Sequence, residues 1–98
     1  MRDLGSLTSA DFRPAIGSVF DVHYGGAEPL PIRLTEVVSF GERPGYRQPF
    51  ALRFEGPGSP VLAQVTHHIV HPDLGELELF LGPVQSASEG VTYEAVFN

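Results

Sequence analysis

The sequence contains neither cysteine nor lysine, and no apolar run in it approaches the length of a membrane span. Without cysteine, disulfide bridges and thiolate metal sites are excluded, so a metal could be held only by histidine and carboxylate. All six basic side chains are arginine, and 12 acidic residues give a net charge of −6. A nucleic-acid backbone repels such a chain, and the acidic excess is most simply a solubility feature. We therefore expect neither a nucleic-acid nor a membrane partner.

The motifs of common catalytic and cofactor sites are also missing. The chain has no Gly-x-Ser-x-Gly elbow, no phosphate-binding loop and no dinucleotide fingerprint. Its first residues, with one arginine followed by Asp3, do not form a signal-peptide pattern. These absences favour a cytoplasmic protein, or one incorporated in a larger assembly, that has no catalytic residues and no cofactor.

Glycine and proline, in contrast, are abundant, with 11 and 9 among 98 residues. Such frequent breakers leave little room for long helices, and short alternating runs between them indicate a small all-β domain. We predict a single domain over residues 1–98, with 1–7 as a flexible arm. Its fold is expected to be a small antiparallel barrel or sandwich of about six strands with one short N-terminal helix.

The helix is expected at residues 9–16. Thr8 or Ser9 can serve as its N-cap, and Asp11 lies in the first turn, where the helix dipole favours an acid. Phe12 and Ile16 are four residues apart and would share the buried face.

Alternation of apolar and polar residues predicts the strands. Single strands are expected at residues 18–24, 30–39, 47–54 and 91–97, with a bulge near residues 37–38. Residues 64–84 form the longest patterned stretch and read as a hairpin turning at 71–75, where Gly75 offers a positive φ. Leu77, Leu79 and Leu81 face the core in this hairpin. A polar break is expected at 85–90 and a mobile loop at 41–45.

The side chains with possible metal chemistry are four histidines: His23, His67, His68 and His71. On a straight strand His67 and His71 lie about 13 Å apart, too far to share one zinc ion. His67 or His68 could instead join His23 from another strand, with Asp73 or Glu76 as the carboxylate ligand. The alternative is a fortuitous set of surface histidines, with His71 hydrogen-bonded to a loop carbonyl and fixing the turn.

Two carboxylates resemble a catalytic pair. Glu76 and Glu78 share a strand face at a spacing of about 7 Å, which also occurs in glycosidases. Adjacent carboxylates on a hairpin are more typical of a solvated face, and we assign no catalytic role to them.

Four segments of the chain occur in an order that is similar to that of a known family: Asp11-Phe12-Arg13-Pro14, Pro49-Phe50-Ala51-Leu52-Arg53-Phe54, His71-Pro72-Asp73-Leu74-Gly75 and the closing Tyr93-Glu94-Ala95-Val96-Phe97-Asn98. Together they resemble a family of small bacterial proteins described only as a domain of unknown function. The resemblance spans nearly the whole chain and implies one compact domain. It also implies a link of some members to phage-tail-like or tail-collar proteins, and it supplies no catalytic residues.

Two functions from different classes follow. The first is a non-enzymatic structural or protein-interaction module, an accessory of a phage-tail-like assembly, with a protein partner or self-association. Its contact surface would include sheet edges and residues 46–50, with Tyr46, Arg47 and Phe80 as candidate anchors. Phe80 points away from the leucine face of its strand. The pattern favours the alternative role for it, in which this second face is also buried and Phe80 is a core residue.

The second function is a small metal-binding protein or metal-assisted enzyme, with zinc held around His67, His68 and His71. A third possibility, an apolar ligand inside a narrow barrel, competes with the side chains that would fill so small an interior.

Overall fold

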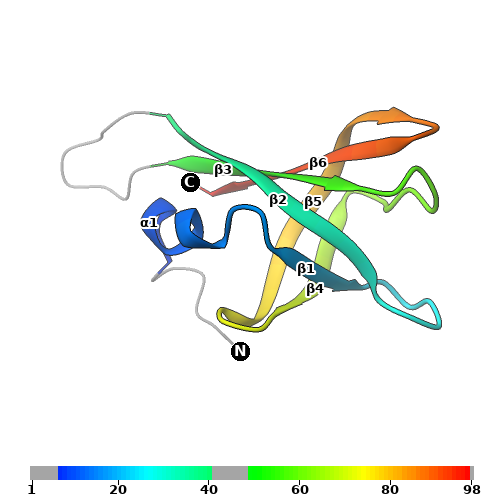
Figure 1. Cartoon of the computed structure of the whole chain (residues 1–98), viewed down its shortest axis with the longest axis horizontal. Coiled ribbons are helices and arrows are strands. Elements are labelled where there is room, and N and C mark those ends of the chain that lie inside the picture. Colours follow the sequence, from blue (N-terminus) through cyan, green and yellow to red (C-terminus); the bar gives the residue numbers. More distant parts are fainter. Residues whose placement is uncertain (1–6, 41–48, 98) are drawn as a thin grey trace.

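The computed structural model describes residues 7–40 and 49–97. Their six strands close into an antiparallel barrel in the order β1-β2-β3-β6-β5-β4 (Figure 1). The strands are β1 Val19–His23, β2 Leu30–Ser39, β3 Phe50–Gly56, β4 Val65–His71, β5 Gly75–Ala87 and β6 Gly90–Phe97, and they follow the helix α1 Ser9–Phe12 and the 3-10 turn η2 Arg13–Ala15. The predicted all-β fold with a short N-terminal helix is confirmed, and of the two architectures the chain adopts the barrel.

The strand faces are those that the alternating pattern predicts. Inward-pointing residues are almost fully buried in every strand, and fully burying one large apolar side chain is worth about 1.5–3 kcal/mol. The largest contributors from the strands are Phe20, Ile32, Leu34, Phe50, Leu52, Phe54, Ile69, Leu77, Leu79 and Tyr93. The barrel is therefore filled by its own side chains.

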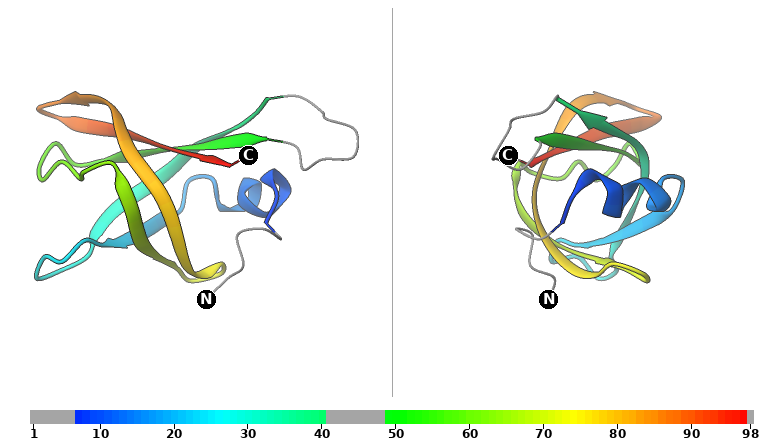
Figure 2. Two further views of the ribbon diagram at one scale, coloured as in Figure 1. Left: turned by 180° about the vertical axis from the view of Figure 1, so that it is seen from behind. Right: turned by 90° about the vertical axis from the view of Figure 1, so that its left-hand side faces the viewer.

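The helix closes one mouth of the barrel, as the end-on view shows (Figure 2, right). The Asp11 carboxylate accepts the backbone N–H of Thr8 at 2.7 Å and so stabilises the first turn. Phe12 packs against Phe50 and Phe97, with ring centroids 5.9 and 5.5 Å away. These two rings stack on each other at 4.5 Å, so three aromatic residues fasten the helix to β3 and β6.

Two expectations near the N-terminus are not met. Ile16 is 44% exposed rather than buried beside Phe12. The reason is that α1 ends at Phe12, η2 follows, and the chain is already extended at Ile16, with ψ at 132°. Leu7, the last residue assigned to the arm, is buried in the core, while residues 1–6 lie outside the described residues.

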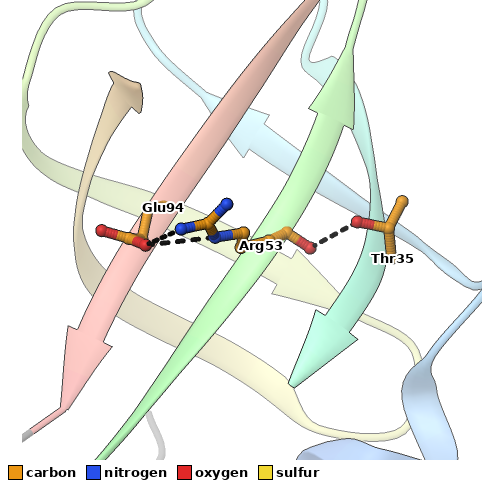
Figure 3. Close-up of polar contacts among 3 residues, drawn as sticks. All are labelled: Thr35, Arg53 and Glu94. Atoms are coloured by element: carbon orange, nitrogen blue, oxygen red, sulfur yellow. Dashed lines mark hydrogen bonds and ion pairs between the residues drawn. The ribbon is translucent and has the colours of Figure 1, made fainter. Parts of the chain in front are cut away.

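The bulge in β2 lies earlier than predicted. The register with β3 shifts between Leu34 and Glu36, so the extra residue is Thr35 rather than one at 37–38. The Thr35 hydroxyl donates to the backbone carbonyl of Arg53 at 3.1 Å, and the Arg53 side chain pairs across to Glu94 on β6 (Figure 3). The Thr35 and Glu36 side chains at the bulge both point outward, so the alternation of inward and outward residues continues on either side of it.

β5 is longer than the sequence pattern suggests. Its first half pairs with β4 and its second half with β6, with a register shift between Pro83 and Gln85. The predicted break at 85–90 is wrong for residues 85–87, because Gln85, Ser86 and Ala87 are exposed strand residues rather than loop. The loop expected at 41–45 lies outside the described residues.

No helix in the described ranges is long and apolar enough to cross a membrane.

Candidate functional site

The barrel divides the four histidines between its two faces. His67 and His71 alternate inward on β4 and are buried, at 6% and 2% exposure. His23 on β1 and His68 on β4 point outward and stand opposite each other in the strand register. The set predicted around His67, His68 and His71 is therefore split by the sheet, and its members do not converge on one ion.

His71 is the most connected of the four. Its Nδ1 atom accepts the backbone N–H groups of Asp73 and Leu74 at 3.1 and 3.2 Å, and its Nε2 lies 2.8 Å from the Ser18 hydroxyl. Its ring packs on Phe20 with the centroids 4.3 Å apart. Burial lowers the pKa of the His71 imidazole, and the Asp73 carboxylate opposes part of that shift.

Which atom donates in each of these hydrogen bonds determines whether Ser18 and His71 could act as a nucleophile and its general base. Because Nδ1 accepts two N–H groups, the proton of the neutral ring is on Nε2, which donates to the Ser18 oxygen. Ser18 in turn donates to the carbonyl of Ala15. A general base would need a free Nε2 facing a serine proton, so the hydrogen-bond direction is opposite to that of a nucleophile–base pair. The pair ties the β4–β5 turn to the chain after η2.

The predicted turn-fixing role of His71 is thus confirmed in substance, although the imidazole accepts loop N–H groups and does not bond a loop carbonyl. Gly75 closes the same turn at φ 80°, as expected for a glycine in this position. His67 also has a structural bond, since its Nε2 lies 2.8 Å from the carbonyl oxygen of Ala63 and donates to it.

The outward histidines form a different arrangement. The ring centroids of His23 and His68 are 5.5 Å apart, and His68 Nε2 lies 3.1 Å from Glu76 Oε1. Of the predicted cross-strand set, the structure brings together His23, His68 and Glu76. It does not bring in Asp73, which neighbours His71. Within residues 7–40 and 49–97, no three histidine or carboxylate side chains are already arranged to hold a metal ion.

Phe80 lies on the same outer face. It is 58% exposed, so its predicted role in a second core face is wrong. Glu76 and Glu78 are exposed on β5 beside it, in keeping with a solvated face. Phe50, at the end of the predicted contact segment 46–50, is fully buried, while Tyr46 and Arg47 lie outside the described residues.

An open groove of about 510 Å³ lies on another side of the barrel, against β2 and the ends of β3 and β6. Arg33, Glu55 and Glu89 line it, together with exposed Val19 and Pro57. The Arg33 guanidinium has no ion-pair or hydrogen-bond partner among the described residues. With one cation between two carboxylates, the groove shows no preference for a ligand of one charge.

Comparison with known proteins gives a family. A model described as "Domain of unknown function (DUF6916)" matches residues 7–97. The chain belongs to this family. No curated protein and no solved structure matches it. The resemblance seen in the sequence is confirmed to the extent that the family is a small domain of unknown function.

Sequence reasoning missed several members of the DUF6916 domain's polar framework. Ser18 carried no signal, because its partner His71 lies 53 residues away. Arg53 and Glu94 are register partners on β3 and β6, a pairing that depends on the strand order. Only the alternation that points both of them outward was visible in the sequence.

Proposed function

We propose that the domain is a non-enzymatic protein-interaction module whose contact surface is the outer face of the β4–β5 hairpin, with Phe80 as its anchor. The observation that carries this proposal is the exposure of Phe80 at 58% in the middle of a paired strand. Thr66 stands opposite it, and the register continues without interruption from Val65↔Leu81 to His71↔Gly75. The exposure of the ring is therefore not the result of a frayed end.

The strand also holds the anchor in place before any partner arrives. Leu79 and Leu81, the neighbours of Phe80, are buried and fix the backbone on the core side. An aromatic ring on such a rigid support loses little conformational entropy on binding. Burying it in a partner would contribute about 1.5–3 kcal/mol, and aromatic anchors of this kind are enriched at interface centres.

The charges around Phe80 indicate the chemistry of the partner. Asp21, Glu76 and Glu78 point outward on β1 and β5, and no arginine or lysine occurs in β1, β4 or β5. A partner that presents an apolar pocket flanked by arginine or lysine would complement this face. We propose a phage-tail-like assembly as the setting for such a partner, which is the link that the resemblance of the sequence segments implies.

The contact surface proposed here differs from the one predicted from sequence. The sheet closes on itself, so its edges are paired around the ring, and Phe50 is in the core. The hairpin face takes the place of the sheet edges in the proposal, and Tyr46 and Arg47 are not needed for it.

The test is a pull-down of the products of neighbouring genes with the wild-type chain and two variants. Phe80→Ser should weaken capture of the partner at least tenfold. Phe40→Ser is the matched control, because Phe40 is 55% exposed but follows β2, away from the hairpin, and it should capture the partner normally. Circular dichroism checks that both variants fold.

Sedimentation of the wild-type chain covers self-association, which Phe80→Ser should also abolish if the partner is a second copy. Equal capture by both variants, or a wild-type monomer that binds none of the neighbouring products, would contradict the proposal.

A further inference from the structure

The outward side chains of β1, β4 and β5 contain a second feature that does not depend on Phe80. His23 and His68 are the last register pair between β1 and β4, and Glu78 is the register partner of His68 on β5. Glu76, two residues before Glu78, contacts His68 diagonally. Two imidazoles and two carboxylates thus stand on adjacent strands, where side chains of neighbouring positions are within reach of each other.

From this placement we propose that His23, His68 and Glu76 bind a divalent transition-metal ion of the Zn²⁺ type on the outer surface of the barrel. The ligand types suit such an ion, since imidazole nitrogen and carboxylate oxygen are its ordinary protein ligands where cysteine is absent.

The first distance that supports the site is the separation of the two rings. With Zn–N bonds of about 2.0–2.1 Å and tetrahedral angles, the centroids of two imidazoles on one ion lie roughly 5 Å apart. The centroids of His23 and His68 are 5.5 Å apart. The register pairing thus places the two side chains side by side, and in their present rotamers the rings are near the separation that a shared ion requires.

The second distance concerns the carboxylate. Two ligand atoms bound to one zinc ion at about 2.0–2.2 Å are roughly 3.3 Å from each other. His68 Nε2 and Glu76 Oε1 are 3.1 Å apart. In the structure this is a direct contact between the imidazole and the carboxylate, which an ion between the two atoms would replace with little change in their separation. His68 touches Glu76 and neighbours His23, and so would be the central ligand.

One local adjustment completes the set of three. His23 must turn about its side-chain torsions so that a ring nitrogen faces the space between His68 and Glu76. His23 is exposed, and the Glu76 side chain is 57% exposed, so staggered rotamers are open to both without displacing core atoms. Glu78, the register partner of His68, is the further carboxylate of this face that would supply a fourth ligand or replace Glu76.

The local charge favours a cation. Asp21 and Glu76 flank Val70 in the register, Glu78 lies in the next row, and these three strands contain neither arginine nor lysine. The negative field of the face attracts a divalent ion, and its openness leaves the remaining coordination positions to water. Such a site binds reversibly and differs from a closed structural zinc site.

The test uses the chain without a histidine tag, stripped with a chelator and titrated with zinc chloride in a calorimeter. We expect one ion per chain in the wild type. Affinity should fall at least tenfold in His68→Ala and in His23→Ala, and should fall by a smaller factor in Glu76→Gln. Glu89→Gln is the control, since Glu89 is an exposed carboxylate in the β5–β6 turn, and it should bind as the wild type does.

A second readout identifies the rings. Zinc should shift the nuclear magnetic resonance signals of the His23 and His68 imidazoles and leave those of the buried His67 and His71 in place. Saturable binding that survives both alanine substitutions, signals that move at His67 or His71 instead, or no binding at millimolar zinc would each overturn the proposal. Phe80→Ser should bind zinc normally, which separates this outcome from that of the interaction module.

Discussion

The Nε2 atom of His71 lies 2.8 Å from the hydroxyl oxygen of Ser18, a residue 53 positions earlier in the chain. The contact joins the turn between β4 and β5 to the start of β1. Removing the hydroxyl in Ser18→Ala leaves the buried Nε2–H without an acceptor, and we expect a loss of about 1–2 kcal/mol in the free energy of unfolding. Ser39→Ala is the control: its hydroxyl accepts a bond from Arg13 at an exposed site, so the loss there should stay below about 0.5 kcal/mol. Urea unfolding measures both, and equal losses would contradict the structural role of Ser18.

Stability should fall in mildly acidic solution because of His71. Burial lowers the pKa of this imidazole in the folded state, whereas in the unfolded chain it titrates near its ordinary value of 6.5. Below that value the unfolded state binds a proton that the folded state does not, so the unfolding free energy is highest above it and decreases as the pH falls through it. Urea unfolding between about pH 7.5 and 5.5 should show this decrease, and His71→Asn should have a shallower slope. Identical slopes would refute the assignment to His71.

Leu79→Ala tests the core of the hairpin. Leu79 is 1% exposed, and truncating a buried leucine leaves a cavity that typically costs about 2–5 kcal/mol. Phe80→Ala at the next position removes more atoms from an exposed side chain and should cost less than about 1 kcal/mol. Thermal unfolding of the two variants side by side measures the difference. If Leu79→Ala kept the wild-type midpoint, the inward assignment of β5 would be wrong.

The Tyr93 hydroxyl has one buried partner. It accepts the backbone N–H of Leu62 at 3.0 Å, and Tyr93 is fully buried. Tyr93→Phe keeps the ring but leaves that N–H unpaired, so we expect a loss of about 1–3 kcal/mol in the unfolding free energy. Tyr24→Phe removes the hydroxyl of a tyrosine that is 40% exposed and should change stability by less than about 0.5 kcal/mol. A further readout is the exchange rate of the Leu62 amide hydrogen, which should rise in Tyr93→Phe alone.

The ion pair between Arg53 and Glu94 should contribute little. Both Nε and Nη2 of Arg53 approach the same Glu94 oxygen, at 3.2 and 3.1 Å, but the arginine side chain is 46% exposed (Figure 3). Exposed pairs contribute about 0.2–1 kcal/mol and are screened by salt. A double-mutant cycle with Arg53→Ala and Glu94→Ala should give a coupling in that range, smaller in 1 M salt. A coupling that is large and independent of salt would contradict this view of the pair.

The inward half of the fold was readable from the sequence because a strand with one buried face leaves a period of two. Phe50, Leu52 and Phe54 show this pattern, and all three are fully buried. The pattern failed at Gln85–Ala87 in β5. The run there was predicted to be a loop, but it is a strand whose side chains are exposed. The pattern also failed at Ile16, because the helical segment ends at Ala15 and the backbone at Ile16 is extended, so the helical spacing from Phe12 no longer applies.

For the candidate site, the sequence could indicate which residues were able to bind a metal ion, but not which of them lie together. Which histidines meet depends on β1 pairing with β4, and the chain closes that pairing after two other strands have intervened. Spacing along β4 showed that His67 and His71 were too far apart for one ion, but it carried no information about the meeting of His23 and His68. The same holds for Ser18 and His71, whose contact depends on where the barrel mouth is closed.

Within the described residues, β1 and β4 share three register pairs, Asp21↔Val70, Val22↔Ile69 and His23↔His68, which is fewer than any other two neighbouring strands share. A closed ring of strands opens first between the two strands that share the fewest paired residues, because the fewest contacts must break there. Slow opening motions of this protein should therefore begin by parting β1 from β4, with the other strands still joined as one open sheet. An ion held by His23 and His68 would link β1 to β4 and oppose this opening.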